Sequence, residues 1–288
     1  MVVFKKVALV GKYKSVDIAK PMQAVVGFLR ERKIDVVMED QTCAQLNLSD
    51  IESGPLGDIV KESDLVVVLG GDGTMLGVAG VVAEANRAPL LGINQGRLGF
   101  LTDISVETML DSLNAVISGE FEIDERLMLK VRLEERAHPI IYALNDISVS
   151  KGQSGSLMEM EVTIDSKLAY RLRADGLIVA TPTGSTAYAL SAGGPILDPS
   201  LSAISLVPVS PHTLSNRPIV IPGESSVEIT LTEGIDARMH VDSHTHLDVG
   251  MGARILISRA ENPLRLIHPQ GHDHFRTLRE KLRWASLL

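Results

Sequence analysis

Residues 64–74 of the 288-residue chain read Asp-Leu-Val-Val-Val-Leu-Gly-Gly-Asp-Gly-Thr. The apolar run 65–69 does not alternate with polar residues, which is typical of a strand buried on both faces of a parallel sheet. Gly70 and Gly71 end this strand, because glycine permits a sharp turn and a close approach of the backbone. A helix is predicted to follow over 75–85. The stretch therefore predicts a strand, a glycine turn and a helix, which together form the basic unit of an α/β domain.

Similar units surround this stretch in the first third of the chain. Short apolar runs at 7–10, 34–38 and 89–93 predict three further strands. Apolar residues at steps of three and four over 18–29 predict an amphipathic helix, and a last helix over 106–117 is expected to stop at a glycine. This order predicts an α/β domain with a mostly parallel sheet over residues 1–122.

The apolar pattern changes its period from about residue 123. Apolar and polar residues alternate over 127–134, 158–165 and 227–232, which predicts half-buried antiparallel strands. Strands of this kind between turn signals predict an all-β, sandwich-like domain over residues 123–264. Apolar residues at helical spacing near the C-terminus predict a terminal helix within 265–288, and we expect it to pack back on the first domain.

The composition excludes several classes of protein. Hydrophobic residues make up 45% of the chain and charged residues 22%, close to the averages of globular proteins, which excludes disordered and collagen-like chains. The 28 basic and 36 acidic residues give a net charge of −8, so there is no overall basic surface for nucleic acid. The single cysteine, Cys43, indicates a reducing compartment. No apolar run is long enough to span a membrane and Lys5 and Lys6 interrupt any signal sequence, so we expect a cytoplasmic protein.

The glycine turn is the first candidate site. A helix N-terminus after such a turn presents unpaired N–H groups that favour a phosphate. The turn has neither the Gly-Lys-Ser/Thr of a P-loop nor the Gly-x-Gly-x-x-Gly spacing of dinucleotide folds, and its distinctive residue is Asp72. A carboxylate beside a phosphate is unfavourable unless a cation bridges the two or the carboxylate takes a proton from an attacking hydroxyl, so Asp72 indicates phosphoryl transfer. The alternative is a structural turn with a helix cap. The candidate phosphate-binding residues are Gly70, Gly71, Gly73 and Thr74.

Two further stretches carry candidate binding residues. Residues 92–100 hold three glycines after the next predicted strand, at the sheet edge where ligands bind in open α/β folds, although a structural turn also explains them. Residues 175–194 begin with a buried strand over 177–180, and five hydroxyl groups follow between Thr181 and Tyr188. One helix cap needs fewer hydroxyls than this, although an ordinary capped helix remains the alternative.

Together these motifs closely resemble those of the NAD kinase family, whose members phosphorylate the 2′-hydroxyl of the adenosine ribose of NAD to make NADP. The resemblance covers nearly the whole chain and includes the glycine turn, the loop 94–100, Asn145-Asp146, the segment 175–195 and Asp242-Ser243. It implies ATP as the phosphoryl donor, with other triphosphates or polyphosphate left open, and a divalent cation, Mg²⁺ or Mn²⁺, at the phosphates. It also implies a site between the two domains and self-association into homodimers or homotetramers.

The resemblance further implies roles for individual residues. Asp72 is expected to be the general base, with Gly73 close to the phosphate, and Asn145 and Asp146 are expected to hydrogen-bond the ribose hydroxyls. His244 departs from the family pattern, which often has glutamine there, so its contact with the nucleotide is left open. The other NAD-binding residues that the resemblance implies are Arg173, Asp175, Thr186, Ala187, Tyr188, Ala189, Leu190 and Ser191.

Two other functions are compatible with the same residues. Lipid and sugar kinases contain related Gly-Gly-Asp-Gly loops, although the chain offers no amphipathic membrane-surface helix for a lipid substrate. A non-catalytic dinucleotide sensor would use the same pockets, although it would gain little from Asp72 beside a phosphate. Both functions therefore stay as alternatives to NAD kinase activity.

The histidines form a second pattern. His240, Asp242, His244 and His246 occupy alternate positions, which on one strand would place them on one face and imitate a metal site. Residues on one face of a strand lie about 6.5 to 7 Å apart, so three of them along one strand do not readily share an ion. No protein ligand of a metal is therefore assigned. The remaining C-terminal histidines, expected to be turn and tail residues, are His268, His272 and His274.

Overall fold

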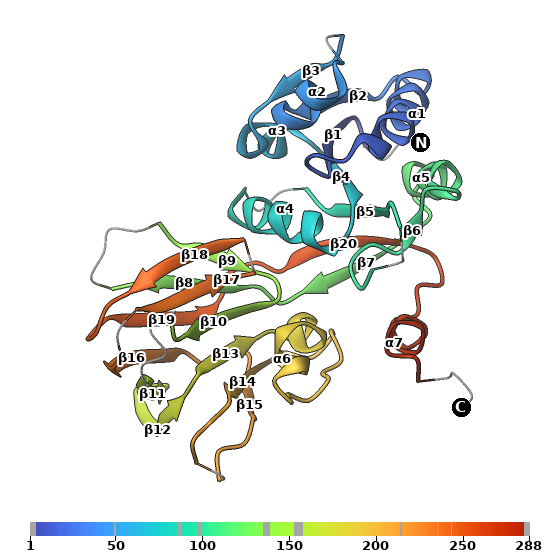
Figure 1. Ribbon diagram of the computed structural model, residues 1–288. Helices are drawn as coiled ribbons and strands as arrows, with labels where there is room; N and C mark the ends of the chain where they lie inside the picture. Colours follow the sequence, from blue (N-terminus) through green and yellow to red (C-terminus); the bar gives the residue numbers. More distant parts are fainter. Residues whose placement is uncertain are drawn as a thin grey trace. The chain divides into compact units, whose positions relative to one another are not determined.

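The computed structural model describes residues 4–48, 50–85, 88–96, 99–134, 139–152, 158–213, 215–234, 236–242 and 244–284. The chain divides into two compact units, Met1–Glu125 with Arg265–Leu288, and Arg126–Leu264 (Figure 1). The first unit is α/β and the second is built from antiparallel strands, so the predicted fold class is confirmed.

An eight-stranded sheet forms the centre of the first unit. Its strands are β1 (Lys6–Gly11), β2 (Asp35–Glu39), β3 (Glu52–Gly54), β4 (Leu65–Gly70), β5 (Leu90–Asn94), β6 (Ile104–Ser105), β7 (Phe121–Arg126) and β20 (Leu264–Pro269). Their order is β3-β2-β1-β4-β5-β20-β7, with β6 beside β5, and β4 is parallel to both of its neighbours. Every residue of β4 is buried, as expected for a strand covered on both faces.

The helices of the first unit are α1 (Ala19–Glu31), α2 (Asp40–Leu46), α3 (Leu56–Glu62), α4 (Asp72–Ala85), α5 (Met109–Ser118) and α7 (His274–Leu282), with a short 3₁₀ helix at Val16–Ile18. The sequence patterns did not predict α2 and α3, because seven residues are too few to establish a helical period. The predicted end of α5 is confirmed, since Gly119 takes the left-handed conformation at φ 93°. The packing expected for α7 stays a prediction.

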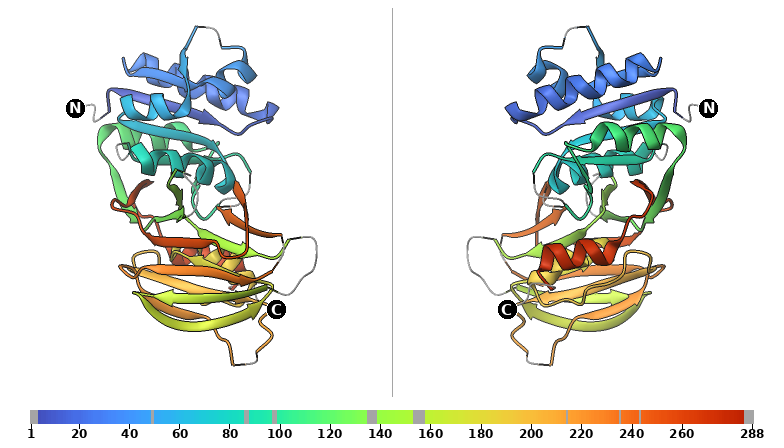
Figure 2. Two further views of the ribbon diagram at one scale, coloured as in Figure 1. Left: turned by 90° about the vertical axis from the view of Figure 1, so that its left-hand side faces the viewer. Right: turned by 90° about the vertical axis from the view of Figure 1, so that its right-hand side faces the viewer.

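Two six-stranded antiparallel sheets form the second unit. One has the order β15-β14-β13-β10-β17-β18, and the other has the order β12-β11-β16-β19-β8-β9. Their strands are β8 (Leu129–Leu133), β9 (Ile141–Ala143), β10 (Asp146–Ser150), β11 (Met158–Ile164), β12 (Lys167–Ala174), β13 (Gly176–Ala180), β14 (Ala203–Val209), β15 (Ile219–Pro222), β16 (Val227–Glu233), β17 (Ala237–Val241), β18 (Thr245–Val249) and β19 (Arg254–Arg259). The two sheets are curved and form two layers, one on the other (Figure 2).

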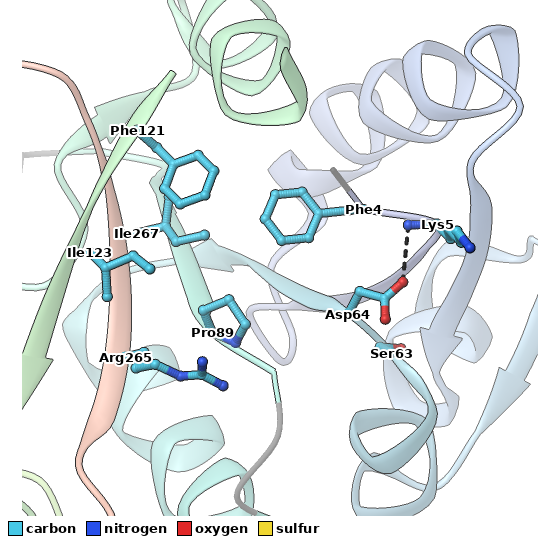
Figure 3. A pocket seen from close by; sticks show the side chains of 9 residues that line it. All are labelled: Phe4, Lys5, Ser63, Asp64, Pro89, Phe121, Ile123, Arg265 and Ile267. Carbon is cyan, nitrogen blue, oxygen red and sulfur yellow. Dashed lines mark hydrogen bonds between the residues drawn. The ribbon is translucent and has the colours of Figure 1, made fainter. Parts of the chain in front are cut away.

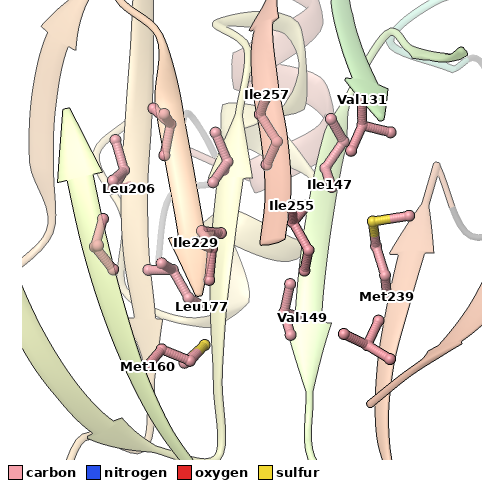
Figure 4. Packing of buried hydrophobic residues seen from close by; sticks show 14 of the residues in the cluster. Val131, Ile147, Val149, Met160, Leu177, Leu206, Ile229, Met239, Ile255 and Ile257 are labelled. Carbon is pink, nitrogen blue, oxygen red and sulfur yellow. The ribbon is translucent and has the colours of Figure 1, made fainter. Parts of the chain in front are cut away.

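Apolar side chains of both sheets fill the space between these layers. Val131 and Ile255 come from one sheet and Ile147 and Leu177 from the other, and all four are buried in one cluster (Figure 4). On β8 and β11 the polar residues between the buried ones are more exposed, which is the period-two pattern of a half-buried strand. The second unit is therefore a β-sandwich.

A short helix covers part of the outer face of this sandwich. α6 (Tyr188–Ser191) follows the 3₁₀ helix Thr183–Thr186 and buries Ala189 against Ile178 and Val207. This packing explains why β13 is buried on both faces although it belongs to an antiparallel sheet. It also fixes the hydroxyl-rich turn at the end of β13.

Candidate functional site

Asp72 is the first residue of α4, and its carboxylate is held by a loop that follows β5. The Phe100 N–H donates to Oδ2 at 2.8 Å, and the Leu101 N–H donates to Oδ1 at 3.0 Å. The Thr102 hydroxyl donates to Oδ1 at 3.2 Å. α4 thus begins three residues earlier than the sequence predicts, so Asp72 lies in the first helical turn. Its side chain is oriented by the loop after β5.

The same loop is braced by the end of β5. The Asn94 side-chain amide donates to Thr102 Oγ1 at 2.7 Å, and its oxygen accepts the Gly96 N–H at 2.6 Å. Gly99 passes so close to Asp72 that no side chain fits there. Arg97 and Leu98 of this predicted loop lie outside the described residues. The glycine turn after β4 and the loop after β5 are therefore in contact at one edge of the sheet, as predicted, and the Asp72 carboxylate makes this contact.

The glycines of the turn differ in their surroundings. A Cβ on Gly70 would lie 2.4 Å from Thr74 Oγ1, so this glycine is required by the fold itself. A Cβ on Gly71 or Gly73 would have no atom within 4 Å, and neither residue has a positive φ. Next to Asp72 there are therefore two glycine positions where the fold alone would accept a side chain.

A pocket of about 430 Å³ lies at another place in the first unit. Phe4 and Lys5 precede β1 and Asp64 precedes β4, so the pocket lies at the amino ends of the parallel strands (Figure 3). The Asp64 carboxylate accepts the Lys5 N–H at 3.0 Å. Ligands of open α/β sheets bind at the carboxyl ends, where the glycine turn follows β4, so this pocket is separate from the candidate site.

In the second unit, Asp242 organises the segment that contains Asn145 and Asp146. Its Oδ2 accepts the Leu144 N–H at 2.6 Å, and its Oδ1 accepts the N–H groups of Asn145 at 2.8 Å and Asp146 at 3.0 Å. Asp242 itself has a left-handed φ of 48°, which turns the chain after β17. The resemblance includes Asp242 in an Asp-Ser pair, but a pattern in the sequence does not show which backbone groups its carboxylate binds. Ser243 lies outside the described residues.

The hydroxyl-rich turn packs directly against Asn145. The Thr181 N–H donates to the Asn145 carbonyl at 2.9 Å, and the Thr181 hydroxyl donates to the Leu144 carbonyl at 2.5 Å. A Cβ on Gly184 would lie 2.0 Å from the Asn145 oxygen, so glycine is needed for this approach. The segments around 145, 184 and 242, distant in sequence, therefore form one polar cluster.

Two carboxylates of this cluster are buried. Burial and, secondly, the charge of Asp242 raise the pKa of Asp146 to about 7. Burial also raises the pKa of Asp242, although three backbone N–H donors partly offset the shift. A protonated Asp146 can donate as well as accept a hydrogen bond, so its charge is sensitive to pH near neutrality.

The structure does not bring the other predicted binding residues together at one place. Residues 186–191 follow the turn at Gly184, whereas Arg173 and Asp175 precede β13, at the opposite end of the β10–β13 ladder from Asn145. Tyr188 and Ser191 are exposed on α6, and Thr186, Ala187 and Leu190 are partly buried beside them. Ala189 is fully buried in the core beneath α6, so its side chain does not face a ligand.

The charged residues among them have protein partners. Arg173 lies on the outer face of β12, where its Nε is 2.6 Å from Glu159 Oε2. The Glu159 carboxylate raises the pKa of Arg173. Asp175 pairs with Lys151, with 2.6 Å between Oδ1 and Nζ. His244 is exposed in the turn after β17, where its N–H donates to the Val241 carbonyl.

The histidines of the 240–246 pattern lie on two strands and the connection between them, and the expectation that His268 is a turn or tail residue is wrong. Asp242 and His244 lie in turns between β17 and β18, so the alternate positions do not share one strand. The rings of His240 and His246 lie opposite each other on β17 and β18, with centroids 6.3 Å apart. His268 is not a turn residue, because it lies on β20 with 1% of its surface exposed. β20 lies between β5 and β7 in the sheet, and burial there decides the position of His268. No apolar period in the sequence reveals this burial.

The comparison with protein families covers both units. Residues 7–121 match the ATP-NAD kinase N-terminal domain, and residues 144–269 match the ATP-NAD kinase C-terminal domain. Together with the fold and the polar clusters, these matches define an enzyme of the phosphotransferase class. The chain belongs to the ATP-NAD kinase family.

Individual relatives agree with this membership. NAD kinase of Thiobacillus denitrificans is 47% identical over 99% of both chains, and NAD kinase of Nitrosospira multiformis is 45% identical over 99% of this chain and 97% of its own. The crystal structure of yeast NADH kinase complexed with NADH superimposes with a TM-score of 0.91 at 28% identity, covering 99% of this chain and 89% of that one. An NAD kinase from Archaeoglobus fulgidus in complex with ATP has a TM-score of 0.77 at 28% identity, covering 96% of this chain and 98% of that one. Among the described residues, no helix is long and apolar enough to cross a membrane.

Proposed function

We propose that this enzyme transfers the γ-phosphoryl group of ATP to the 2′-hydroxyl of the adenosine ribose of NAD, with Asp72 as the general base. The orientation of Asp72 is the observation that carries this proposal. A carboxylate has about four lone-pair positions, and the described loop residues engage three of them. The remaining position on Oδ2 can accept the proton of an attacking hydroxyl, because the other three bonds prevent the carboxylate from turning away.

The phosphates of ATP are proposed to bind at the glycine turn. A Cβ on Gly71 or Gly73 would meet no protein atom within 4 Å, and these residues lie at the start of a 14-residue helix. The N-terminus of such a helix carries a partial positive charge and favours an anion. Close approach of phosphate oxygens would explain glycine at two positions where the fold itself leaves room for a methyl group.

A divalent cation fits the chemistry of this turn. The side chains of Asp72 and Thr74 offer oxygen atoms, the donors that Mg²⁺ and Mn²⁺ prefer. When bound with ATP, such a cation neutralises charge on the phosphoryl oxygens. We propose Mg²⁺ or Mn²⁺, held mainly by the phosphates, and we assign it no fixed set of protein ligands.

NAD is proposed to bind through the polar cluster of the second unit. Asn145 and Asp146 would bind the ribose hydroxyls, because Asp242 and the turn at Gly184 hold their backbone rigidly. Tyr188 and Ser191, exposed beside this cluster, would contact the nucleoside. The further contacts proposed from the family resemblance come from Arg173, Asp175, Thr186, Ala187, the backbone of Ala189, Leu190 and His244.

Arg173 and Asp175 would have to exchange a present partner for the nucleotide. Their ion pairs with Glu159 and Lys151 are at least partly exposed, and exposed ion pairs contribute little stability, so such an exchange costs little. The family resemblance further suggests a cytoplasmic homodimer or homotetramer. Light scattering would determine the oligomeric state directly.

The proposal is tested by following NADP formation from NAD, ATP and Mg²⁺, using a dehydrogenase specific for NADP. NADH in place of NAD and polyphosphate in place of ATP define the acceptor and donor range. Asp72→Asn is expected to lower kcat by at least about 100-fold, the contribution of a general base, while NAD still binds.

The Asp72→Asn substitution also changes the contacts of the loop. The NH₂ group of the new asparagine would face a backbone N–H, and this N–H would have no acceptor, at a cost of about 1 to 3 kcal/mol. Thr102→Val is the matched control, since it removes one hydrogen bond to the carboxylate but keeps the base. Near-normal turnover by Asp72→Asn would exclude the base role. Tight NAD binding without NADP formation by the wild-type enzyme would instead identify a dinucleotide sensor.

A further inference from the structure

Three side chains of the first unit converge on one point. His268 Nδ1 lies 2.7 Å and His272 Nδ1 lies 2.9 Å from the same oxygen, Oδ2 of Asp103. The two imidazole rings stack with their centroids 3.9 Å apart and an interplanar angle of 17°. One ligand atom from each residue lies within 4.8 Å of the other two.

The backbone places these residues before any ligand binds. Asp103 directly follows Thr102. His268 lies on β20, and Ile267, the residue before it on this strand, pairs with Leu91 of β5. Gly271 has a φ of 81°, which turns the chain so that His272 returns over the ring of His268. Both imidazoles are largely buried, with 2% and 13% of their side chains exposed.

Hydrogen bonding within this cluster leaves two buried atoms without a partner among the described residues, Asp103 Oδ1 and His268 Nε2. A neutral imidazole carries one N–H, so a His268 that donates from Nδ1 presents a lone pair at Nε2. Oδ2 of Asp124 is 3.7 Å from that atom. A lone pair next to a carboxylate is unfavourable, and each unpaired buried atom costs about 1 to 3 kcal/mol.

We propose that Asp103, His268 and His272 bind one Zn²⁺ ion. The ion takes the place of the two shared protons, and the proton of each neutral imidazole moves to its Nε2. His268 Nε2–H then faces Asp124, the carboxylate partner that zinc-bound histidines commonly have. Ligand atoms of a tetrahedral zinc site lie about 3.3 Å apart, so the two contacts to Asp103 open by about 0.5 Å on binding. The stacked rings are nearly parallel, so one imidazole also rotates until both Nδ1 lone pairs point at the ion.

The ligand atoms of this site differ from those of the cation proposed at the ATP phosphates. Two imidazole nitrogens and one carboxylate oxygen suit Zn²⁺, whereas Mg²⁺ prefers oxygen ligands. A water molecule completes the fourth position. Because Asp103 is joined directly to Thr102, the ion ties the loop that holds Asp72 to β20 and to the segment before α7. Asp103 is thus a positioning residue.

Calorimetric titration of metal-free full-length protein with Zn²⁺, without any nucleotide, tests the proposal. We expect one ion per chain and a rise in the unfolding temperature, with no such response to Mg²⁺. Asp124→Asn is expected to weaken binding by about 10- to 100-fold, and His272→Ala, which removes a ligand, by more. Circular dichroism establishes that each variant is folded, and the visible spectrum of the Co²⁺-substituted wild-type protein reports tetrahedral coordination independently of any variant.

His246→Ala is the control, because it removes an exposed histidine of the other histidine pair and keeps the proposed ligands. Zn²⁺ binding by this variant should equal that of the wild type. Absence of Zn²⁺ binding by the wild type, or binding by folded His272→Ala as tight as that of the wild type, would overturn the proposal. Since no nucleotide is present, either result leaves the proposed kinase reaction untouched.

Discussion

Gly99 and Asp72 lie so close together that a methyl group on Gly99 would be 1.9 Å from Asp72 Oδ1. The Asp72 carboxylate occupies the space that a Cβ would fill, and the Thr102 hydroxyl, which donates to this carboxylate, would lie 2.5 Å from that Cβ. The loop after β5 therefore fits closely around the Asp72 carboxylate. Such a fit is expected if the reaction rate depends on the orientation of this carboxylate.

Gly99→Ala is expected to displace the Asp72 carboxylate and to lower kcat for NADP formation by about 100-fold or more. Stability should fall by about 1 to 3 kcal/mol, the usual cost of overpacking. Gly96→Ala is the matched control in the same loop, because its Cβ would meet no atom closer than 4.0 Å. Equal activity of the two variants in the coupled NADP assay would contradict this role of Gly99.

Gly71→Ala tests whether phosphate approaches the glycine turn. Its Cβ has no protein atom within 4 Å, so we expect an unchanged unfolding temperature but a KM for ATP raised about tenfold or more, equivalent to about 1.4 kcal/mol. Gly57→Ala, which is equally free of contacts, lies in α3 and should leave the KM for ATP unchanged. An unaltered KM in Gly71→Ala would place the phosphates elsewhere.

Asp242→Asn tests the support of Asn145 and Asp146. The amide NH₂ leaves the Leu144 N–H without an acceptor, so the free energy of unfolding should fall by about 1 to 3 kcal/mol and the KM for NAD should rise. Urea unfolding at about pH 5 isolates this loss, because Asp146 is then protonated and no charge repulsion is relieved. Asp248→Asn, in an exposed ion pair with Arg238 on the same hairpin, should cost less than about 1 kcal/mol. If both variants lose the same stability and bind NAD alike, the assignment of Asp242 is wrong.

The pKa of Asp146 predicts a dependence of stability on pH. Burial and the charge of Asp242 raise this pKa from 3.8 to about 7, so the folded protein binds the proton more tightly than the unfolded chain. Between these two values the folded state holds more protons, and the free energy of unfolding therefore falls as pH rises. When the pH is raised from about 5 to about 8, the free energy of unfolding of Asp146→Asn should fall less than that of the wild type. Urea unfolding measures both. Parallel curves for the two proteins would show that Asp146 does not titrate in this range.

Much of the fold could be predicted because its signals are local. The continuous apolar run before the glycine turn predicts a buried strand, and Gly119 predicts the end of α5 because a left-handed residue is needed there. The change to period two predicts the antiparallel unit. The helices α2 and α3 were not predicted, since each has only seven residues and so no helical period. The start of α2 depends on a single contact, the Glu39 carboxylate, which accepts the N–H groups of Gln41 and Thr42.

The sequence by itself determined the two architectures, the glycine turn at the end of a buried strand and the presence of Asp72 there, because strand burial and turn formation depend on neighbouring residues. The tertiary structure decided which groups those residues meet. Asp242 binds the backbone of Asn145 from 97 positions away, and His268 meets Asp103 across 165 positions. No periodicity encodes such contacts, because they arise only when packing of the sheets brings distant polar groups together and excludes the water that would otherwise pair with them.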